Sequence, residues 1–226
     1  MVSINTEKIN KKDFIEINFT GRVKNGEVFD STLKDDLKKI NPNFPEERIK
    51  PFVFCLGEGM FLDAIDEFLS GKETGKYDVE LSPEKAFGKR NPQLIKIIPL
   101  KIFREKNTNP YPGMVFNFDG NLGKIISVSG GRVITDFNNP LAGKDVVYEI
   151  IVNRKIDDIN EKIKSLMNFF FRREFDFDLT ETEKKLTIKT DKTFKNFVEL
   201  FKKKFEDILG LKIEVIEEIL EAKKDN

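Results

Sequence analysis

Short runs of alternating apolar and polar residues, separated by turn residues, constrain the fold of this chain most. Residues 14–19, FIEINF, alternate as a half-buried strand does. Asn25 and Gly26 then predict a type I′ hairpin turn into a second strand. Residues 61–69 carry apolar side chains at helical spacing, and Gly71 is placed to end that helix. Further strands are predicted at 51–57, 77–81 and 146–152.

The segment from residue 89 to residue 137 differs from its flanks. It is rich in β-branched residues. Asp-Gly at 119–120 and Gly-Gly at 130–131 predict hairpin loops between its strands. We therefore expect a small antiparallel sheet that interrupts the first domain. Residues 155–226 predict a helix, a hairpin, a second helix with a phenylalanine-rich face and a last strand. The expected fold class is α+β, with domains at 1–88 plus 138–154, at 89–137 and at 155–226.

Charge and the rare residue types exclude several classes of function. The chain has 39 basic and 39 acidic residues, so a general binder of nucleic acid or of an anionic membrane is not expected. It has no histidine, which removes the usual general base and the usual zinc ligand. Cys55 is the single cysteine, and it lies between apolar neighbours as a core thiol does. Neither a metal nor another cofactor is therefore expected.

Hydropathy indicates where the protein works. No run of about 18 apolar residues occurs, so no membrane span is predicted. The first ten residues, MVSINTEKIN, are polar and lack the apolar centre of a signal peptide. A chain with one cysteine also fits a reducing compartment. We expect a cytoplasmic protein.

Six short motifs follow one another in a fixed order. They are FTG at 19–21, GEVFDST at 26–32, PFVFCLGEG at 51–59, SGKETG at 70–75, SPEKAFG at 82–88 and DFNNPLAGK at 136–144. In order and spacing the chain resembles the FKBP-type peptidyl-prolyl cis-trans isomerases, specifically their long SlyD-like prokaryotic and archaeal branch. The resemblance covers about residues 10–154. In that branch an extra β-domain, called insert-in-flap, follows the AFG-like motif, where the segment 89–137 lies.

The resemblance implies a fold, an activity and partners. The fold is an FKBP half-barrel antiparallel sheet around a short helix, with an inserted small antiparallel β domain and here a C-terminal α+β domain. The activity is cis-trans isomerisation of Xaa-Pro bonds, with a chaperone role for the inserted domain. The partners are unfolded or proline-containing polypeptides and macrolide inhibitors. A surplus apolar face in 155–226 further suggests a homodimer.

The resemblance also gives candidate site residues. The candidate catalytic residues are Asp30, Phe19, Phe29, Phe87 and Tyr148. The candidate substrate-binding residues are Phe52, Phe61, Leu62 and Ile65, with Ile95, Ile97, Ile98, Phe116 and Phe118 in the inserted domain. Phe19 and Phe87 stand where the family usually has tyrosine, and each missing hydroxyl costs roughly 1 kcal/mol of hydrogen bonding.

Elementary chemistry agrees with this activity. A prolyl bond rotates over a barrier of about 20 kcal/mol that amide resonance creates. Lowering it needs no nucleophile, because a dry apolar pocket that favours the twisted amide is sufficient. Two alternatives stay open: a holdase-like binding module with little turnover, and a scaffold whose main product is the dimer. Taken singly, each phenylalanine is more often a core residue than a site residue.

Overall fold

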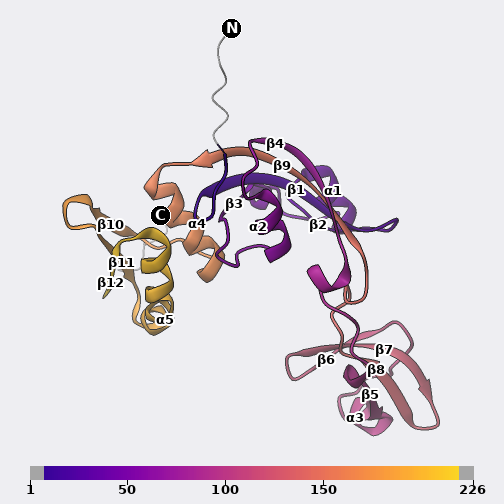
Figure 1. The fold of residues 1–226 in the computed structure, drawn as a ribbon. Helices are drawn as coiled ribbons and strands as arrows, with labels where there is room; N and C mark the ends of the chain where they lie inside the picture. Colours follow the sequence, from indigo (N-terminus) through magenta and orange to yellow (C-terminus); the bar gives the residue numbers. More distant parts are fainter. Residues whose placement is uncertain (1–7, 219–226) are drawn as a thin grey trace. The chain divides into compact units, whose positions relative to one another are not determined.

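A five-stranded sheet curves over a short helix in the first part of the chain (Figure 1). In the computed structural model, which describes residues 8–218, its order is β2-β1-β9-β4, and β3 pairs antiparallel with β1. The strands are β1 Phe14–Val23, β2 Val28–Ser31, β3 Phe52–Cys55, β4 Gly75–Leu81 and β9 Val146–Ile156. The predicted alternation in β1 is confirmed, because Ile15, Ile17 and Phe19 are buried while Glu16 and Asn18 are only half-buried.

Two short helices accompany this sheet, α1 Lys34–Ile40 and α2 Asp63–Leu69. Helix α2 lies beneath the curved sheet (Figure 1), and its Ile65 and Leu69 are fully buried. Gly71 lies just beyond the helix with a φ of 81°, the left-handed conformation that glycine adopts most easily. The predicted end of this helix is therefore confirmed.

The turn between β1 and β2 differs from the sequence prediction. The Gly26 N–H donates to the Val23 carbonyl at 2.8 Å, so the hairpin forms where it is expected. A type I′ turn needs positive φ at both central residues, but here only Asn25 has one, at 56°. The type I′ assignment is wrong, because a single left-handed residue at the third position is the pattern of a type II turn.

A four-stranded antiparallel sheet forms from the segment after β4. Its order is β5-β8-β7-β6, with β5 Ile95–Pro99, β6 Val115–Phe118, β7 Asn121–Ser129 and β8 Arg132–Asp136. Helix α3 Leu100–Glu105 follows β5 directly and was not predicted. Six residues are too few for a helical period to stand out in the sequence. Its Phe103 is fully buried and forms the core of this sheet with Ile125 and Val133.

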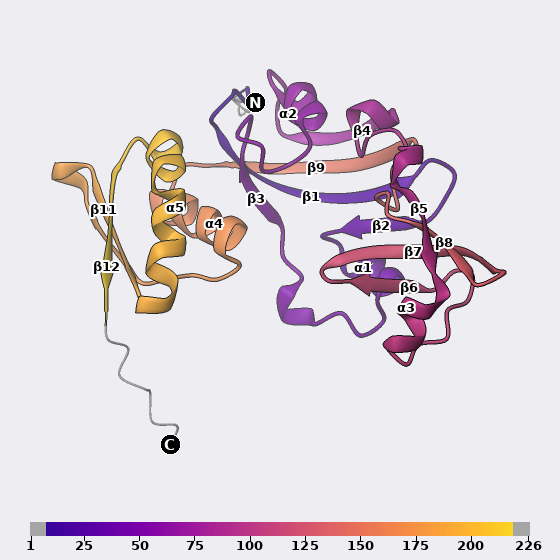
Figure 2. The ribbon, with the colours of Figure 1, turned by 90° about the horizontal axis from the view of Figure 1, so that it is seen from below.

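The last part of the chain is a three-stranded sheet with two helices on one face (Figure 2). The elements are α4 Ile159–Phe171, β10 Phe177–Thr180, β11 Lys185–Thr190, α5 Lys192–Leu209 and β12 Lys212–Glu217. Asp158 and Asp191 cap α4 and α5 by accepting hydrogen bonds from N–H groups of the first turn. β11 and β12 are parallel, so α5 is the crossover that joins them. The predicted order of helix, hairpin, helix and strand is confirmed.

The chain forms two compact units. One consists of Met1–Gly21, Val28–Val79 and Tyr148–Asn226, and the other of Arg22–Glu27 and Glu80–Val147. The α+β class is confirmed, whereas the division into three domains stays a prediction. The start of the chain, used above to argue against a signal peptide, lies mostly outside the described residues. Among residues 8–218, no helix has both the length and the apolar character needed to cross a bilayer.

Candidate active site

Predicted pocket residues from four strands and one loop meet in an aromatic cluster. The Phe19 ring centroid lies 5.0 Å from that of Phe61, 6.0 Å from that of Tyr148 and 6.4 Å from that of Phe52. Phe29 meets Tyr148 edge-on at 5.8 Å, and Phe61 meets Tyr148 in the same way at 5.5 Å. Tilted and edge-on pairs at these distances are favourable beyond the area that they bury. Five residues far apart in the sequence therefore form one apolar site.

Helix α2 and the loop before it supply the rest of the predicted pocket. Ile65 is fully buried on α2, and Leu62, the residue before the helix, is half-buried. Phe54 stacks on Phe52 at 5.1 Å and was not predicted as a site residue. Phe52 and Phe54 are two residues apart in β3 and therefore lie on the same face of the strand, with their rings nearly parallel at an interplanar angle of 10°.

Gly21 makes room for two of these rings. A Cβ atom at this position would lie 2.8 Å from Phe29 Cζ and 3.0 Å from Tyr148 Cε1. Both distances are shorter than ordinary carbon-carbon contacts. The FTG motif therefore contains a glycine because the rings of β2 and β9 occupy the space above it.

A buried hydrogen-bond network fixes the end of β2 that carries Phe29 and Asp30. The Ser31 hydroxyl donates to the Phe19 carbonyl at 3.0 Å, and the Thr32 hydroxyl accepts from the Phe19 N–H at 2.9 Å. The Thr20 hydroxyl lies 2.9 Å from the Ser31 hydroxyl and donates to Asp36 at 2.8 Å. The Ser-Thr pair of the FDST motif thus ties β2 to β1 and holds Phe29 in position.

Asp30 is the one acidic residue among the predicted pocket residues. The residue is exposed, but nearby protein atoms displace water from its carboxyl group and raise its pKa, an effect that the Ser31 N–H partly offsets. Burial raises the pKa of the Tyr148 hydroxyl, and the negative charge of Asp30 raises it further. The two groups therefore interact, and Tyr148 stays protonated beside a carboxylate.

Cys55 lies below the cluster in β3 and is fully buried. Burial raises the pKa of its thiol to about 12. A thiol with this pKa is not a nucleophile at neutral pH. The prediction of a core thiol is confirmed.

Asp66 is a residue of the site that the sequence reasoning missed. It is 4% exposed on α2, and its Oδ2 accepts a hydrogen bond from the Gly57 N–H at 3.0 Å. Its Oδ1 has no hydrogen-bond partner within residues 8–218, and burial raises the pKa of the carboxyl group to about 6. Asp66 holds the loop that leads to Phe61 against the helix that carries Ile65. The signal was present, because Asp66 shares the apolar face of Leu62, Ile65 and Leu69.

Two family models match the chain. Residues 5–101 match the FKBP-type peptidyl-prolyl cis-trans isomerase model, and residues 96–141 match the model of the FKBP26 IF domain. A short-type peptidyl-prolyl cis-trans isomerase of Methanocaldococcus jannaschii is 32% identical over 145 residues, which cover 64% of this chain and 92% of that protein. The chain belongs to the FKBP-type peptidyl-prolyl cis-trans isomerases.

Other relatives of this FKBP-type isomerase carry similar names. A probable FKBP-type 16 kDa isomerase of Pseudomonas fluorescens is 28% identical, over 64% of this chain and 89% of that protein. The SlyD isomerase of Vibrio cholerae is 29% identical, over 45% of this chain and 53% of that protein. The resemblance to SlyD-like isomerases is therefore confirmed, and the protein is a peptidyl-prolyl cis-trans isomerase that acts on proline-containing polypeptides.

The remaining predicted site residues of this FKBP-type isomerase lie in the second unit. Ile95 and Ile97 of β5 are exposed, at 38% and 62%. Ile98, Phe116 and Phe118 are half-buried and pack against the core around Phe103. Phe87 is half-buried in the same unit, and its catalytic role stays a prediction.

Proposed function

We propose that the protein accelerates rotation about Xaa-Pro bonds by holding the proline in the aromatic cluster of Phe19, Phe29, Phe52, Phe61 and Tyr148, above the buried Ile65 of α2. The observation that carries this proposal is the convergence of these rings from separate strands. The twisted amide is less polar than the planar one, so an apolar pocket stabilises it more than it stabilises the ground state. Part of a barrier of about 20 kcal/mol is removed in this way without proton transfer.

Asp30 supplies the polar part of the proposed mechanism. Its carboxylate lies next to Phe29 and interacts with the buried Tyr148 hydroxyl. A carboxylate at the rim of an apolar pocket orients the dipole of the substrate carbonyl, and its effect is stronger where water is displaced. Tyr148, whose ring centroid lies 6.0 Å from that of Phe19, is proposed to supply the hydroxyl that Phe19 lacks.

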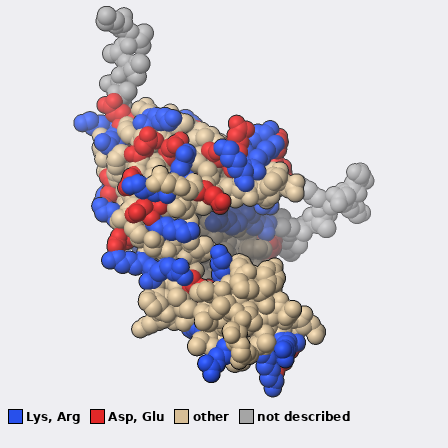
Figure 3. Space-filling view, turned by 90° about the vertical axis from the view of Figure 1, so that its right-hand side faces the viewer, with Lys and Arg blue, Asp and Glu red and all other residues tan. Residues whose placement is uncertain are grey.

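The small four-stranded sheet is proposed to bind unfolded segments of the client. Apolar side chains on it are exposed to solvent: Ile97 at 62%, Tyr111 at 63%, Val115 at 58% and Leu122 at 64%. Figure 3 shows few charged side chains on one side of this sheet, the lower body in that view. Apolar surface of this kind is typical of a site for other polypeptides.

Peptide exchange tests the isomerase proposal. We expect micromolar protein to accelerate cis-trans exchange in a neutral Xaa-Pro peptide, measured by NMR exchange spectroscopy. Asp30→Ala should lower the catalysed rate by about tenfold, since a partly exposed charge contributes less than a buried one. Ile65→Ala should lower it as well. Asp78→Ala, which removes an exposed carboxylate from β4, is the control. A wild-type protein without any acceleration contradicts the proposal.

Deletion of residues 90–136 separates catalysis from client binding and tests the holdase alternative. Arg90 pairs with Asp136, and the Asn91 N–H donates to Asn138 at 2.8 Å, so the two ends of the deleted segment are adjacent. We expect the shortened protein to isomerise short peptides and to lose protection of unfolded proteins against aggregation. If the full chain protects clients but never isomerises, the holdase alternative holds.

The other sequence-based expectations belong to the same proposal. The working protein has three domains, is cytoplasmic, binds macrolide inhibitors in the aromatic cluster, and forms a homodimer through 155–226. Exposed apolar residues of this last segment support the dimer: Phe197 at 41%, Leu200 at 78% and Ile216 at 36%.

A further inference from the structure

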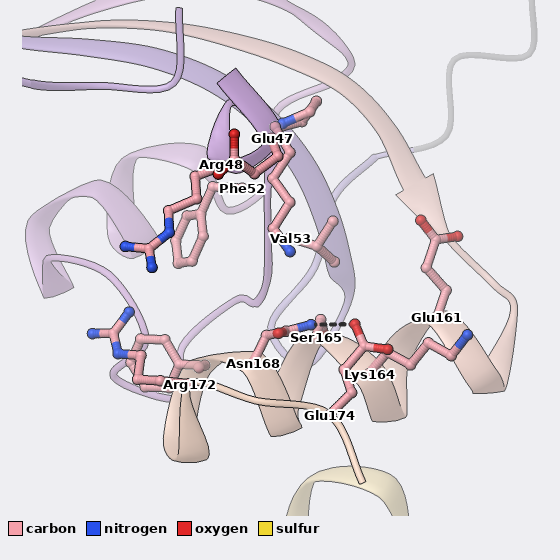
Figure 4. Close-up of a pocket in the computed structure, with 13 residues that line it drawn as sticks. Glu47, Arg48, Phe52, Val53, Glu161, Lys164, Ser165, Asn168, Arg172 and Glu174 are labelled. Carbon is pink, nitrogen blue, oxygen red and sulfur yellow. Dashed lines mark hydrogen bonds between the residues drawn. The ribbon is translucent and has the colours of Figure 1, made fainter. Parts of the chain in front are cut away.

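A groove of about 720 Å³ lies between the segment that leads into β3 and helix α4 (Figure 4). One wall consists of residues 47–53 and the other of residues 161–174. Both walls belong to the same compact unit. Of the residues assigned to the isomerase mechanism, only Phe52 lines this groove.

Phe52 connects the groove with the aromatic cluster. Its ring lines the groove and lies 5.7 Å from Phe61 and 6.4 Å from Phe19, which belong to the cluster. On the other side the ring lies 6.4 Å from Phe169 of α4, which also lines the groove. A polypeptide with its proline in the cluster therefore has neighbouring residues within reach of the groove.

The backbone of β3 suits an extended chain. Among residues 8–218, β3 pairs with one strand, β1, so no described strand pairs with its other edge. An unpaired edge offers N–H and C=O groups to a polypeptide that lies alongside it. The groove runs beside this edge, because Phe52 and Val53 of β3 line it.

The charges of the groove favour an acidic occupant. Four lining residues are basic, namely Arg48, Lys50, Lys164 and Arg172, and all four are exposed. Within residues 8–218 none of the four forms an ion pair. Three lining residues are acidic: Glu161 is paired with Arg154 at 2.5 Å, Glu174 accepts a hydrogen bond from Asn168 at 2.7 Å, and Glu47 is exposed. Figure 4 shows Arg48 and Arg172 reaching toward the same end of the groove from opposite walls.

We propose that this groove binds an acidic segment of the client polypeptide next to the isomerised proline. The inference rests on the proposed function, since it assigns a sequence preference to the same substrate. Arginine side chains bind carboxylates with two parallel hydrogen bonds, and Phe52 and Phe169 supply apolar contact beside them. Complementary charge also speeds the encounter of client and enzyme, an effect that salt weakens.

Peptides of equal length test the proposal on the full chain. They contain the same Xaa-Pro core and carry a short run of glutamates, lysines or glutamines before or after the proline. We expect kcat/KM, measured by NMR exchange, to be highest for a glutamate peptide and to fall toward the glutamine value at high salt. The double variant Arg48→Glu/Arg172→Glu should lose roughly threefold to tenfold on the glutamate peptide and gain on the lysine peptide. Its rate on the glutamine peptide should stay unchanged, which also shows that it is folded.

The matched control is Lys76→Glu/Lys212→Glu, which changes the net charge equally on exposed residues outside the groove. Binding of a dye-labelled glutamate peptide, followed by fluorescence anisotropy, is measured alongside. The proposal is overturned if the glutamate peptide has no advantage, or if both double variants weaken its binding equally. The two proposals can fail separately. If no peptide is isomerised, the proposed isomerase function fails. If the glutamate peptide still binds and its binding depends on Arg48 and Arg172, the assignment of the groove as an acidic-segment site is retained.

Discussion

Single atoms decide how the aromatic cluster packs at Gly21. The glycine is not needed for a left-handed backbone, since its φ is not positive. It is needed for space, because a methyl group would lie 2.8 Å from the Phe29 ring. Either the ring or the strand must move to admit that group.

Gly21→Ala should therefore lower isomerase activity more than it lowers stability. We expect a loss of about 1–3 kcal/mol in the free energy of unfolding from overpacking, with a catalysed exchange rate at least tenfold lower because Phe29 and Tyr148 are displaced. Gly26→Ala in the β1–β2 turn is the control, and it should leave the rate unchanged. An active Gly21→Ala protein would show that the two ring positions do not matter for catalysis.

Asp66 gives a prediction about pH. Its folded-state pKa is about 6 against an ordinary value of 3.8, so the folded protein binds this proton more tightly than the unfolded chain. The stabilisation is complete below the ordinary pKa and is lost as the pH rises through about 6. Above that pH the buried carboxylate is charged, and its Oδ1 has no hydrogen-bond partner in the part of the chain that the structure describes.

Asp66→Asn should raise the Tm at about pH 8, by the equivalent of about 1–3 kcal/mol, and should not raise it at about pH 4. The measurement is thermal unfolding followed by circular dichroism across this range. Glu67→Gln removes an exposed carboxylate from the same helix and should leave the pH dependence as it is. A variant that is less stable at every pH would mean that the bond from Gly57 outweighs the cost of the charge.

At the residue scale, the sequence named five aromatic residues that the fold brings together, while their roles stay a prediction. Phe19, Phe29, Phe52, Phe61 and Tyr148 were found through family motifs, and they meet in one cluster. Asp66 was missed because an acid in a helical pattern is usually exposed, and its partner, the Gly57 N–H, is invisible in a sequence. Phe169 was missed because it lies beyond the last family motif, and only tertiary packing brings it to Phe52.

Among the elements, α3 shows what holds the small sheet together. Its Phe103 ring lies 5.0 Å from Phe116 and 5.5 Å from Phe118, and it is fully buried. The sequence predicted the strands around it because turn residues separate them. It did not predict α3, since a helix of six residues is specified by packing rather than by its own pattern.

Phe103→Ala should unfold or loosen the small sheet without disabling the aromatic cluster. Removing a buried phenylalanine costs about 3–5 kcal/mol, which a sheet of this size does not tolerate easily. We expect loss of aggregation protection with short-peptide exchange preserved. Ile102→Ala, on the exposed side of the same helix, is the control and should change neither. Intact protection in Phe103→Ala would place client binding elsewhere.

For the whole molecule, substitutions of two exposed leucines distinguish self-assembly from client binding. Leu200 of α5 is 78% exposed and Leu122 of β7 is 64% exposed. We expect Leu200→Glu to reduce the mass measured by light scattering from dimer to monomer and to leave client protection intact. Leu122→Glu should leave the dimer intact and reduce client protection. Each variant is therefore the control for the other. A wild-type protein that scatters as a monomer contradicts the dimer.

The contact between Arg90 and Asp136, together with the Asn91–Asn138 hydrogen bond, joins the two ends of the segment that forms the small sheet. Everything between these residues can lengthen, shorten or be exchanged while the chain enters and leaves at one fixed place. This position is therefore a graft point, where a foreign recognition module with adjacent ends could redirect the same isomerase to a different set of clients.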